Sequence, residues 1–366
     1  MKIGIVSFHR EPNYGTMLQA YALAQALRQC GVAAEYIHYS PWPKPPCWKL
    51  MAKQLAARLG RREKGEFAFF QSRPFRPTLR AFQHFLARHI PVSGTHYYAD
   101  TVQRALHCYD RFLVGSDQTW SPLLNKPPYS PFTLSFVPEG SRRLAYAPSL
   151  GTTSPSPSYL EWLAAETREF AALSCRERTN CHLLSQATGR EVTCVLDPTL
   201  LLTSTQWDTL ARPSSLRPRS YVLAYILGEK PQPVAFAERV GAAMGLPVYY
   251  LPTRPCHLHH AHLLDAVGPD TFLGLIRDAA CVVTDSFHGT VFSINYEVPF
   301  YSFTKRSGEQ TDNDRILEVL SQLGLASRFR EDADTTLSPP IDYAPLRHQL
   351  ESLRASSWHY LRSCLQ

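Results

Sequence analysis

The stretch best suited to chemistry is VVTDSFHGTVFSI, residues 282–294. Its apolar start predicts a buried strand, and a helix is expected to begin near Gly289. Asp285, Ser286 and His288 would then lie at the carboxyl end of a parallel strand, where open α/β sheets bind ligands. N–H groups at a helix start attract phosphate or carboxylate, and a histidine titrates near neutral pH and can donate a proton. The same pattern also fits a capped strand–helix turn with a hydrogen-bonded histidine.

Polar side chains also follow several other predicted strands. Because parallel strands share one carboxyl edge, these side chains are expected to converge there. Each signal is weak alone, since Asn-x-Gly and Asp-Pro are common in turns. Lys305 and Arg306 follow a predicted strand and could hold an anion, although a solvated loop explains them as well. The other candidates are His9, Asn13, Tyr14, Gly15, Asp117, Gln118, Arg176, Glu177 and Asp197.

Three other kinds of site are not favoured by the sequence. Ser286 and His288 lie two residues apart without a GxSxG elbow, so a hydrolase triad is not indicated. The cluster CHLHHAH at 256–262 contains metal-binding residue types, but its spacing matches no closed zinc site, and we expect no metal. Neither a GxGxxG turn nor a P-loop is present, so a dinucleotide cofactor is not indicated.

The elements that must position these residues are predicted as two α/β sets. Residues 2–8 form a strand, a helix follows from about Thr16, and 32–39 form a second strand. This β-α-β order favours a parallel, doubly wound sheet. Further strands are predicted at 111–114, 143–147, 192–196, 221–227, 248–251, 281–284 and 300–303, and further helices near 158, 269–279, 312–323 and 345–362.

Length and element order together predict two domains, since 366 residues exceed one comfortable core. We expect an N-terminal Rossmann-like domain over 1–202, a polar linker over 203–219 and a C-terminal Rossmann-like domain over 220–340. The remaining segment, 341–366, is predicted as a helix that packs back on the N-terminal domain. The predicted fold class is α/β, with two Rossmann-like domains facing a cleft.

The basic charge of the chain is concentrated in one insert. Residues 44–90 contain eleven Lys and Arg against two Glu, a net charge of +9, whereas the whole chain carries +7. Within it, Trp48, Met51, Leu55 and Leu59 fall near one helical face, which is typical of a basic amphipathic helix at a membrane interface. An ordinary surface helix is the alternative. No nucleic-acid motif accompanies the charge, so nucleic acid is not an expected partner.

Composition indicates a reduced, globular protein. With 44% hydrophobic and 19% charged residues, wholesale disorder is excluded. Nine scattered cysteines without a CxxC argue against a disulfide framework. No apolar stretch approaches the ~20 residues that cross a bilayer, and the first apolar run is too short for a signal peptide. We therefore expect a cytoplasmic protein, at the inner face of the cell membrane if the basic insert binds lipid.

Five segments taken together resemble the polysaccharide pyruvyl transferase family. They are KIGIVSFHREPNYGTMLQAYAL at the start, FLVGSDQTW at 112–120, LAYAPSLG at 144–151, LSCRE with VLDPTLLL, and GPDTFLGLIRDAACVVTDSFHGTVFSINYEVPF. The resemblance implies a glycosyltransferase-B-like fold. It also implies that phosphoenolpyruvate, as co-substrate and without a cofactor, gives a pyruvate ketal to a sugar of a surface polysaccharide or its lipid-linked precursor.

The resemblance further implies roles for individual residues. His288 and Arg176 match the positions that serve the donor, with His288 as the general acid. The chemistry of this reaction adds further candidates, and Asp117 or Asp285 would orient the acceptor hydroxyl or the histidine. We expect a donor site of Arg176, Ser286, His288, Gly289, Thr290, Lys305 and Arg306, and an acceptor site of His9, Asn13, Tyr14, Gly15, Asp117 and Gln118.

One position departs from the family pattern. Relatives with an R-L-H segment carry an arginine two residues before the histidine, where this chain has Ser286. The change removes one bidentate anion clamp, so either Lys305 and Arg306 replace it or the donor differs. Two alternatives therefore stay open. They are a glycosyltransferase that uses a nucleotide sugar on the same scaffold, and a non-catalytic partner in polysaccharide assembly.

Overall fold

The structure is a computed structural model that describes residues 1–40, 72, 75–125, 130–254, 262–307, 310–311, 314–331 and 334–366. The predicted amphipathic helix at Trp48 and nearly all of the CHLHHAH cluster lie outside these residues. The membrane role of the basic insert therefore stays a prediction. None of the described helices is both long and apolar enough to cross a membrane.

The N-terminal sheet has five parallel strands in the order β3-β2-β1-β4-β5. The strands are β1 (Lys2–Val6), β2 (Ala33–Ser40), β3 (Val92–Tyr98), β4 (Arg111–Val114) and β5 (Arg143–Ala145). The central strand β1 is buried along most of its length, as expected of a parallel strand with helices on both faces. The direction of strand order reverses between β1 and β4, which creates a topological switch point.

The C-terminal sheet repeats this plan with the order β14-β11-β10-β8-β9, again fully parallel. Its strands are β8 (Val222–Tyr225), β9 (Val248–Tyr250), β10 (Cys281–Thr284), β11 (Phe300–Phe303) and β14 (Phe329–Arg330). Its switch point lies between β8 and β10. Two small sheets complete the strands, and they pair β6 (Ser174–Cys175) with β7 (Thr193–Cys194) and β12 (Arg306–Ser307) with β13 (Gln310–Thr311).

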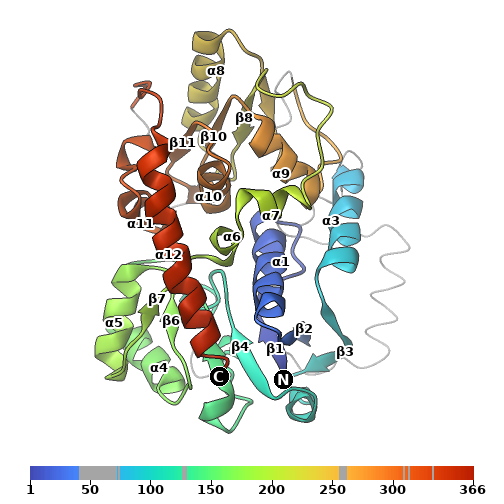
Figure 1. Ribbon diagram of the computed structural model, residues 1–366, viewed down its shortest axis with the longest axis vertical. Coiled ribbons are helices and arrows are strands. Elements are labelled where there is room, and N and C mark those ends of the chain that lie inside the picture. Colours follow the sequence, from blue (N-terminus) through green and yellow to red (C-terminus); the bar gives the residue numbers. More distant parts are fainter. Residues whose placement is uncertain are drawn as a thin grey trace.

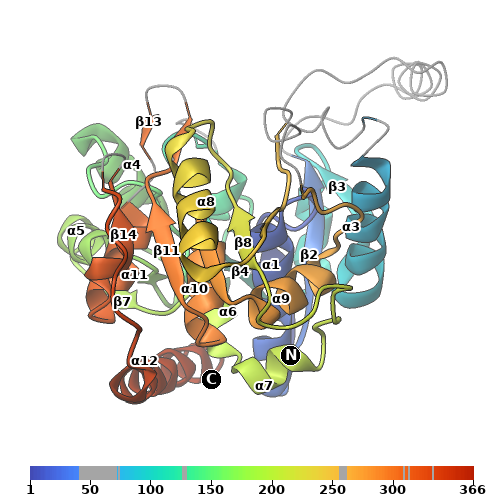
Figure 2. The same ribbon diagram turned by 90° about the horizontal axis from the view of Figure 1, so that it is seen from above.

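Helices cover both faces of the two sheets (Figures 1 and 2). The predicted fold class, α/β with two Rossmann-like domains in a glycosyltransferase-B-like arrangement, is confirmed. The helices are α1 (Tyr14–Gln29), α3 (Arg76–His89), α4 (Pro157–Thr167), α5 (Arg178–Thr188), α6 (Pro198–Leu201), α7 (Ser204–Asp208), α8 (Gln232–Met244), α9 (Pro269–Asp278), α10 (Phe287–Asn295), α11 (Asp314–Gln322) and α12 (Tyr343–Ser363), with short 3₁₀ helices at Val102–His107, Pro131–Thr133, Gly140–Arg142 and Ala326–Arg328.

One apolar core runs through both halves of the molecule. Helix α1 of the N-terminal half packs against α9 and α10 of the C-terminal half. Its first residue, Tyr14, stacks on Phe272 with ring centroids 4.6 Å apart, and its hydroxyl donates to the Val267 carbonyl at 3.1 Å. The two sheets are therefore joined by continuous packing at the start of α1.

The segment predicted as a polar linker is partly helical. It contains α7, and Trp207 of that helix is fully buried. The indole ring lies 5.6 Å from that of Tyr21 and 5.1 Å from that of Phe292, and its Nε1 donates to the Thr199 carbonyl at 3.0 Å. The polar composition of this segment suggested a loose linker, but one large apolar side chain anchors it.

The C-terminal helix α12 crosses from one half to the other (Figure 1). Near its start, the Tyr343 hydroxyl donates to the Val298 carbonyl of the C-terminal half at 2.7 Å. Near its end, the Tyr360 hydroxyl donates to the Ala145 carbonyl of β5 at 2.8 Å. The helix therefore packs on the N-terminal half and also holds the C-terminal half.

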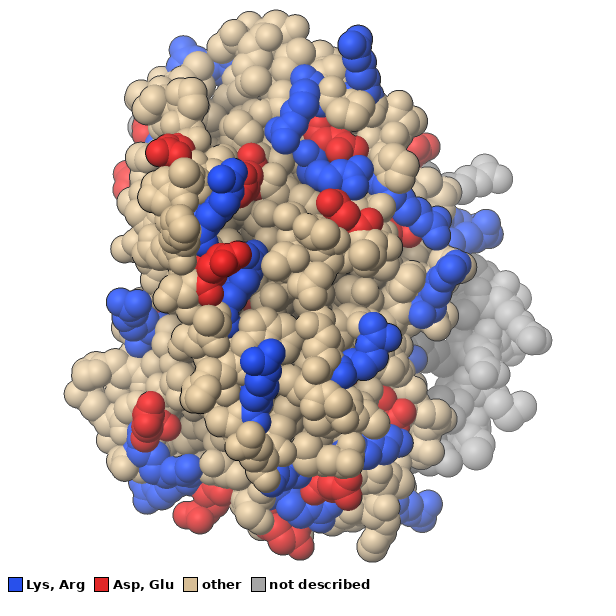
Figure 3. All heavy atoms as spheres, in the orientation of Figure 1, with Lys and Arg blue, Asp and Glu red and all other residues tan. Residues whose placement is uncertain are grey.

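On the face shown in Figure 3, Lys and Arg are interspersed with Asp and Glu. The described residues form no broad patch of a single sign on this face. The charge of the described surface there gives no support for an extended polyanion as partner.

Candidate active site

The two topological switch points lie opposite each other and enclose a cavity of about 190 Å³. Ligands of doubly wound sheets bind at such points, so the cavity is the candidate active site. The N-terminal half lines it with residues that follow β1 and β4, and the C-terminal half with residues that follow β8, β10 and β11 and with one residue of α11. They are Phe8, Asn13, Thr16, Asp117, Gln118, Leu124, Leu227, Asp285, Ser286, Phe287, His288, Lys305 and Arg315.

His288 lies in the first turn of α10 and is buried, with 8% of its side chain exposed. Its Nε2 lies 3.9 Å from Oδ2 of Asp197 and has no hydrogen-bond partner within the described residues. Burial lowers the pKa of His288, and Asp197 and Asp117 offset this only in part. The imidazole is therefore neutral at pH 7 unless a further anion lies beside it.

The Asn-Tyr-Gly sequence at the start of α1 makes room for this histidine. The Asn13 side chain caps the helix by accepting from the Thr16 N–H at 3.1 Å. Gly15 lies directly against the His288 ring, where a Cβ atom would overlap Nδ1 and Cγ. The close approach of backbone to ring therefore requires glycine at position 15.

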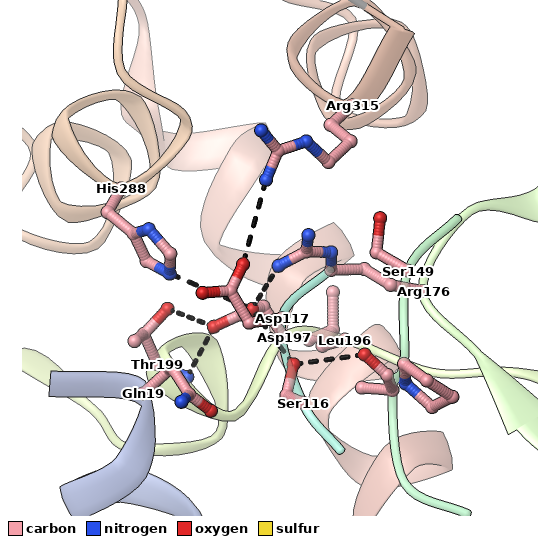
Figure 4. Close-up of polar contacts among 12 residues, drawn as sticks. Gln19, Ser116, Asp117, Ser149, Arg176, Leu196, Asp197, Thr199, His288 and Arg315 are labelled. Atoms are coloured by element: carbon pink, nitrogen blue, oxygen red, sulfur yellow. Dashed lines mark hydrogen bonds and ion pairs between the residues drawn. The ribbon is translucent and has the colours of Figure 1, made fainter. Parts of the chain in front are cut away.

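Arg176 and Asp197 form a buried ion pair beside His288 (Figure 4). Arg176 Nη1 donates to Asp197 Oδ2 at 2.5 Å, and Asp197 Oδ1 accepts from the N–H and the hydroxyl of Thr199 at 3.0 and 2.7 Å. Burial opposes ionisation of Asp197, but Arg176, His288 and Thr199 outweigh it and hold its pKa below the ordinary value. Burial likewise opposes the charge of Arg176, but Asp197 and Glu177 outweigh it and raise its pKa. Both groups are therefore charged.

Arg176 keeps hydrogen-bonding capacity beyond this pair. Its Nε and Nη2 have no hydrogen-bond acceptor among the residues that the structure describes. Its guanidinium carbon lies 4.3 Å from the ring centroid of Phe287, close enough for a cation–π contact. Buried donors of this kind call for a partner, which an anionic ligand would supply.

A second cavity of about 230 Å³ lies behind the first. Arg176 and Asp197 line it, whereas His288 lines the first cavity. Phe287 and Arg315 line both, so the two cavities adjoin at these residues. The two predicted donor residues, His288 and Arg176, therefore both contact Asp197 but do not line the same cavity.

Asp117 faces His288 from the N-terminal half. It follows β4 with a backbone φ of 68°, in the left-handed region that Asp tolerates better than most residues. Its Oδ2 accepts from the Thr16 hydroxyl at 3.4 Å, and its Oδ1 lies 3.8 Å from Nη1 of Arg315 (Figure 4). Together with Asn13 and Gln118, it gives the acceptor side of the cavity its polar lining.

Three acceptor candidates do not line the cavity: Gly15, which lies behind the His288 ring, and the two side chains of Tyr14 and His9. Tyr14 is buried in the packing between the halves, where its ring and hydroxyl are both engaged. His9 contacts the Ser7 carbonyl through Nδ1 at 2.8 Å and packs 5.0 Å from the Tyr36 ring. Burial lowers the pKa of His9 to about 4. Tyr14 and His9 contribute packing beneath the site.

Asp285 lines the cavity but also ties the strands together. Its carboxylate accepts from the N–H groups of Leu227 and Gly228 at 2.6 and 2.7 Å, which joins the ends of β8 and β10. Burial raises the pKa of Asp285, and Lys305 is among the groups that oppose this. Lys305 lines the cavity as predicted, whereas the side chain of Arg306 lies outside the described part of the structure.

The N–H groups that remain available at the start of α10 are not the predicted ones. Ser286 caps the helix, and its Oγ accepts from the Gly289 N–H at 3.3 Å. The Thr290 N–H donates to the Ser286 carbonyl at 3.0 Å. The amides of Gly289 and Thr290 are thus used within the helix start. Among the described residues we find no acceptor for the N–H groups of Phe287 and His288, which lie closest to the cavity.

Sequence reasoning underrated two residues of the site. In the sequence, Asp197 showed only the Asp-Pro pattern of a turn. It follows a strand and precedes Pro and Thr, however, and this order is typical of a residue that caps a helix. Arg315 carried no signal, because it lies in a polar segment that reads as a surface helix. No three His, Cys, Asp or Glu side chains in the described ranges are arranged to hold a metal.

A family model described as polysaccharide pyruvyl transferase matches residues 13–305. Among solved structures, the UDP-GlcNAc 2-epimerase from Methanocaldococcus jannaschii is similar with a TM-score of 0.49 and 10% identity over 96% of this chain and 91% of that chain. The UDP-GlcNAc 2-epimerase from Neisseria meningitidis bound to UDP-GlcNAc gives 0.47 and 11% over 100% and 99%. The E. coli heptosyltransferase WaaC with ADP gives 0.39 and 10% over 96% and 100%. No curated protein matches the chain.

Proposed function

The chain belongs to the polysaccharide pyruvyl transferase family, and we propose that it transfers a pyruvyl group from phosphoenolpyruvate to a sugar of a surface polysaccharide or its lipid-linked precursor. The observation that carries this proposal is the environment of His288. A buried imidazole, whose Nε2 has no hydrogen-bond partner among the described residues, lies at the start of a helix, between two opposed switch points and close to a buried arginine. Protonation of an anionic enol ester needs such a combination of acid and anion-binding groups.

The site offers cationic and N–H partners for the two anionic groups of the donor. Arg176 has two buried nitrogens without an acceptor among the described residues, and a carboxylate would satisfy them bidentately. The N–H groups of Phe287 and His288, at the positive end of α10, and the ammonium of Lys305 suit the phosphoryl group. Lys305 would thereby contribute part of the charge that Ser286 does not.

Donor binding would also prepare His288 for proton transfer. The pKa of this histidine is lowered chiefly by burial, so the imidazole is neutral until an anion approaches. A carboxylate and a phosphate next to the ring favour its charged form and raise its pKa. The general acid would thus be formed in the complex with the donor.

The reaction then follows from this arrangement. His288 transfers a proton to the methylene carbon of phosphoenolpyruvate, and positive charge develops at C2. A sugar hydroxyl attacks C2 and loses its proton. The C2–O bond to phosphate breaks, inorganic phosphate leaves with the bonding electrons, and a second sugar hydroxyl attacks C2 and loses its proton. The product is a ketal whose methyl group contains the proton from the histidine.

Asp117 and Asp197 take different parts in this scheme. Asp117 lies on the acceptor side of the cavity, where its carboxylate would orient a sugar hydroxyl and accept its proton. Asp197 is a positioning residue, because it holds Arg176 at 2.5 Å and stabilises the charged form of His288 from 3.9 Å. Asn13 and Gln118 complete the polar acceptor side.

The test is release of inorganic phosphate from phosphoenolpyruvate with a panel of glycosides and lipid-linked saccharides. We expect release that depends on an acceptor and falls at least about 10²-fold in His288→Ala, the usual scale for loss of a general acid. His348→Ala, which removes an exposed histidine of α12, is the matched control and should keep full activity.

Other outcomes would point to the alternative functions. If the wild-type protein releases no phosphate and only nucleotide sugars stabilise it against heat, it would be a glycosyltransferase. If neither kind of donor binds, and His288→Ala leaves polysaccharide production in cells intact, the chain would be a non-catalytic assembly partner.

A further inference from the structure

Helix α11 belongs to the C-terminal half but makes polar contacts with the N-terminal half. Its apolar side, with Ile316, Val319 and Leu320, is buried in the common core. Its opposite side presents three charged residues at positions 314, 315 and 318, which are neighbours on one helical face. Each of the three reaches a different part of the N-terminal half.

The outer two residues fix the position of the helix. The Asp314 carboxylate accepts from the N–H and the hydroxyl of Thr153 at 2.7 and 2.6 Å. The Glu318 carboxylate accepts from the N–H groups of Arg178 and Thr179, at the start of α5. Helix α5 has no side-chain cap of its own, so a residue of the other half supplies it. These contacts clamp α11 across the two halves.

The middle residue, Arg315, is thereby directed into the candidate active site (Figure 4). Its side chain is only 10% exposed, and it lines both cavities. Its guanidinium lies 5.7 Å from the ring centroid of Phe287, the first residue of α10. Its Nη1 forms an ion pair with Oδ1 of Asp117 at 3.8 Å. A long arginine held this deep in a polar cavity has a geometry suited to an anion.

The anion that fits this position is a phosphoryl group. Arg315 lies beside the first residue of α10, where helix N–H groups and the ammonium of Lys305 also face the cavity. Three kinds of phosphate-binding group, a helix start, a guanidinium and an ammonium, therefore line one wall. Arg176 lies 4.3 Å from the centroid of the same Phe287 ring and is engaged with Asp197 in the neighbouring cavity, so we assign it to the carboxylate of the donor.

We propose that Arg315 binds the phosphoryl group of the donor and the departing phosphate, and that the contacts of α11 with the N-terminal half deliver it to the site. This inference rests on the function proposed above. It makes Arg315, a residue of a separate helix, the second arginine of the donor site beside Arg176. It also links donor binding to the relative position of the two halves, because the contacts of α11 with the N-terminal half direct Arg315 into the cavity.

The experiment compares Arg315→Gln with the wild type in two assays. The first measures binding of inorganic phosphate alone by calorimetry, and the second measures KM for phosphoenolpyruvate in the phosphate-release assay. We expect the dissociation constant of phosphate and the KM for phosphoenolpyruvate to rise about ten- to hundredfold, the scale of one lost charge-assisted contact. The KM for the acceptor should stay unchanged. Arg347→Gln, which removes an exposed arginine of α12, is the matched control and should change neither constant.

Further variants separate ligand binding from a structural role. Arg315→Lys should give an intermediate loss, since it keeps the charge but not the planar fork. Added guanidinium ion should restore part of the phosphate affinity of Arg315→Ala, which a merely structural arginine would not allow. Glu318→Gln weakens the clamp but retains Arg315 and should raise both constants less than Arg315→Gln does. If Arg315→Gln does not fold, Arg315→Lys and the guanidinium rescue decide the matter.

The outcomes distinguish this inference from the proposed function. Unchanged phosphate affinity and unchanged KM in Arg315→Gln, with an active wild type, would overturn the role of Arg315 alone. Phosphate binding that depends on Arg315, in a wild type that releases nothing from phosphoenolpyruvate, would overturn the pyruvyl donor and support the phosphate site.

Discussion

The pKa of His288 is subject to two opposing influences. Burial favours the neutral imidazole, whereas the carboxylates of Asp197 and Asp117 favour the imidazolium, and burial is the larger effect. An acid that must protonate carbon therefore begins in its unprotonated form. The anionic donor is the group that can change this balance, because its negative charge beside the ring would favour the imidazolium.

We predict that donor binding takes up a proton at pH 7. Free His288 has a pKa below its ordinary value of about 6.5, and the bound anion raises it, so affinity for phosphoenolpyruvate should fall as pH rises. Calorimetry in buffers of different ionisation enthalpy measures the uptake. His288→Gln removes the titrating group but not the titration of the ligand itself. Equal uptake in the two proteins would show that His288 does not change its protonation.

Asp197 offers a second prediction at the scale of single residues. Asp197→Asn removes the nearer of the two carboxylates beside the buried Arg176 and leaves only Glu177 at 3.6 Å, and breaking a buried pair costs about 3–5 kcal/mol. We expect a loss of unfolding free energy of this order in urea, together with a large loss of activity. Ser116→Ala removes a neutral hydroxyl that contacts the same carboxylate at 3.3 Å and the Ala147 carbonyl at 3.0 Å, and it should cost about 0.5–1.5 kcal/mol. Similar losses for the two variants would contradict the role of the ion pair.

At the scale of elements, the start of α1 decides where the catalytic ring can lie. Gly15 and His288 come from different halves, and the absence of a side chain at Gly15 lets the helix backbone support the imidazole. A residue without a side chain thus determines the geometry of the proposed general acid.

We predict that Gly15→Ala displaces the imidazole and lowers kcat by about 10²-fold or more, as expected when a reacting group is misplaced by an ångström. The added methyl group should also destabilise the fold by about 1–3 kcal/mol. Gly94→Ala is the matched control, because a Cβ at that position meets no atom within 4 Å. Steady-state kinetics and thermal unfolding of both variants check this. Normal kcat in Gly15→Ala would mean that the ring tolerates another position.

How far the sequence predicts these elements depends on whether the signal is local. The strand and turn at 282–294 were predictable, because apolar periodicity and a capping serine are encoded within a few residues. The convergence of Asp117 with His288 was predictable in outline, since both follow central strands of parallel sheets. The roles of Arg315 and Gly15 were not, because each depends on how α11 or α1 packs on the opposite half. The same holds for Tyr14, whose ring stacks on Phe272 and whose hydroxyl donates to the Val267 carbonyl, both more than 250 positions away in the chain.

At the scale of the whole molecule, the two halves are joined by more than a linker. The largest apolar cluster includes side chains of both sheets, and α12 contacts both halves. The site lies at this junction, so its geometry depends on the relative position of the two halves. Because the packing is continuous across the junction, the site has a defined geometry.

We therefore predict that the two halves unfold together. Calorimetry should give one transition whose calorimetric and van't Hoff enthalpies agree. Leu361→Ala, at a fully buried position near the end of α12, should lower the free energy of unfolding by about 2–5 kcal/mol and shift that single transition as a whole. Two resolved transitions, with only one of them moved by Leu361→Ala, would contradict a common core.

The central claim is that His288 protonates the methylene carbon of phosphoenolpyruvate and that the pyruvyl group is transferred to a sugar. The most direct test is to run the reaction in D₂O and to analyse the purified saccharide product by mass spectrometry and NMR. The account predicts a ketal whose methyl group carries a single deuterium, with formation abolished in His288→Ala and unaffected in His348→Ala. A product without deuterium in the methyl group, or formed at the wild-type rate by His288→Ala, would contradict it.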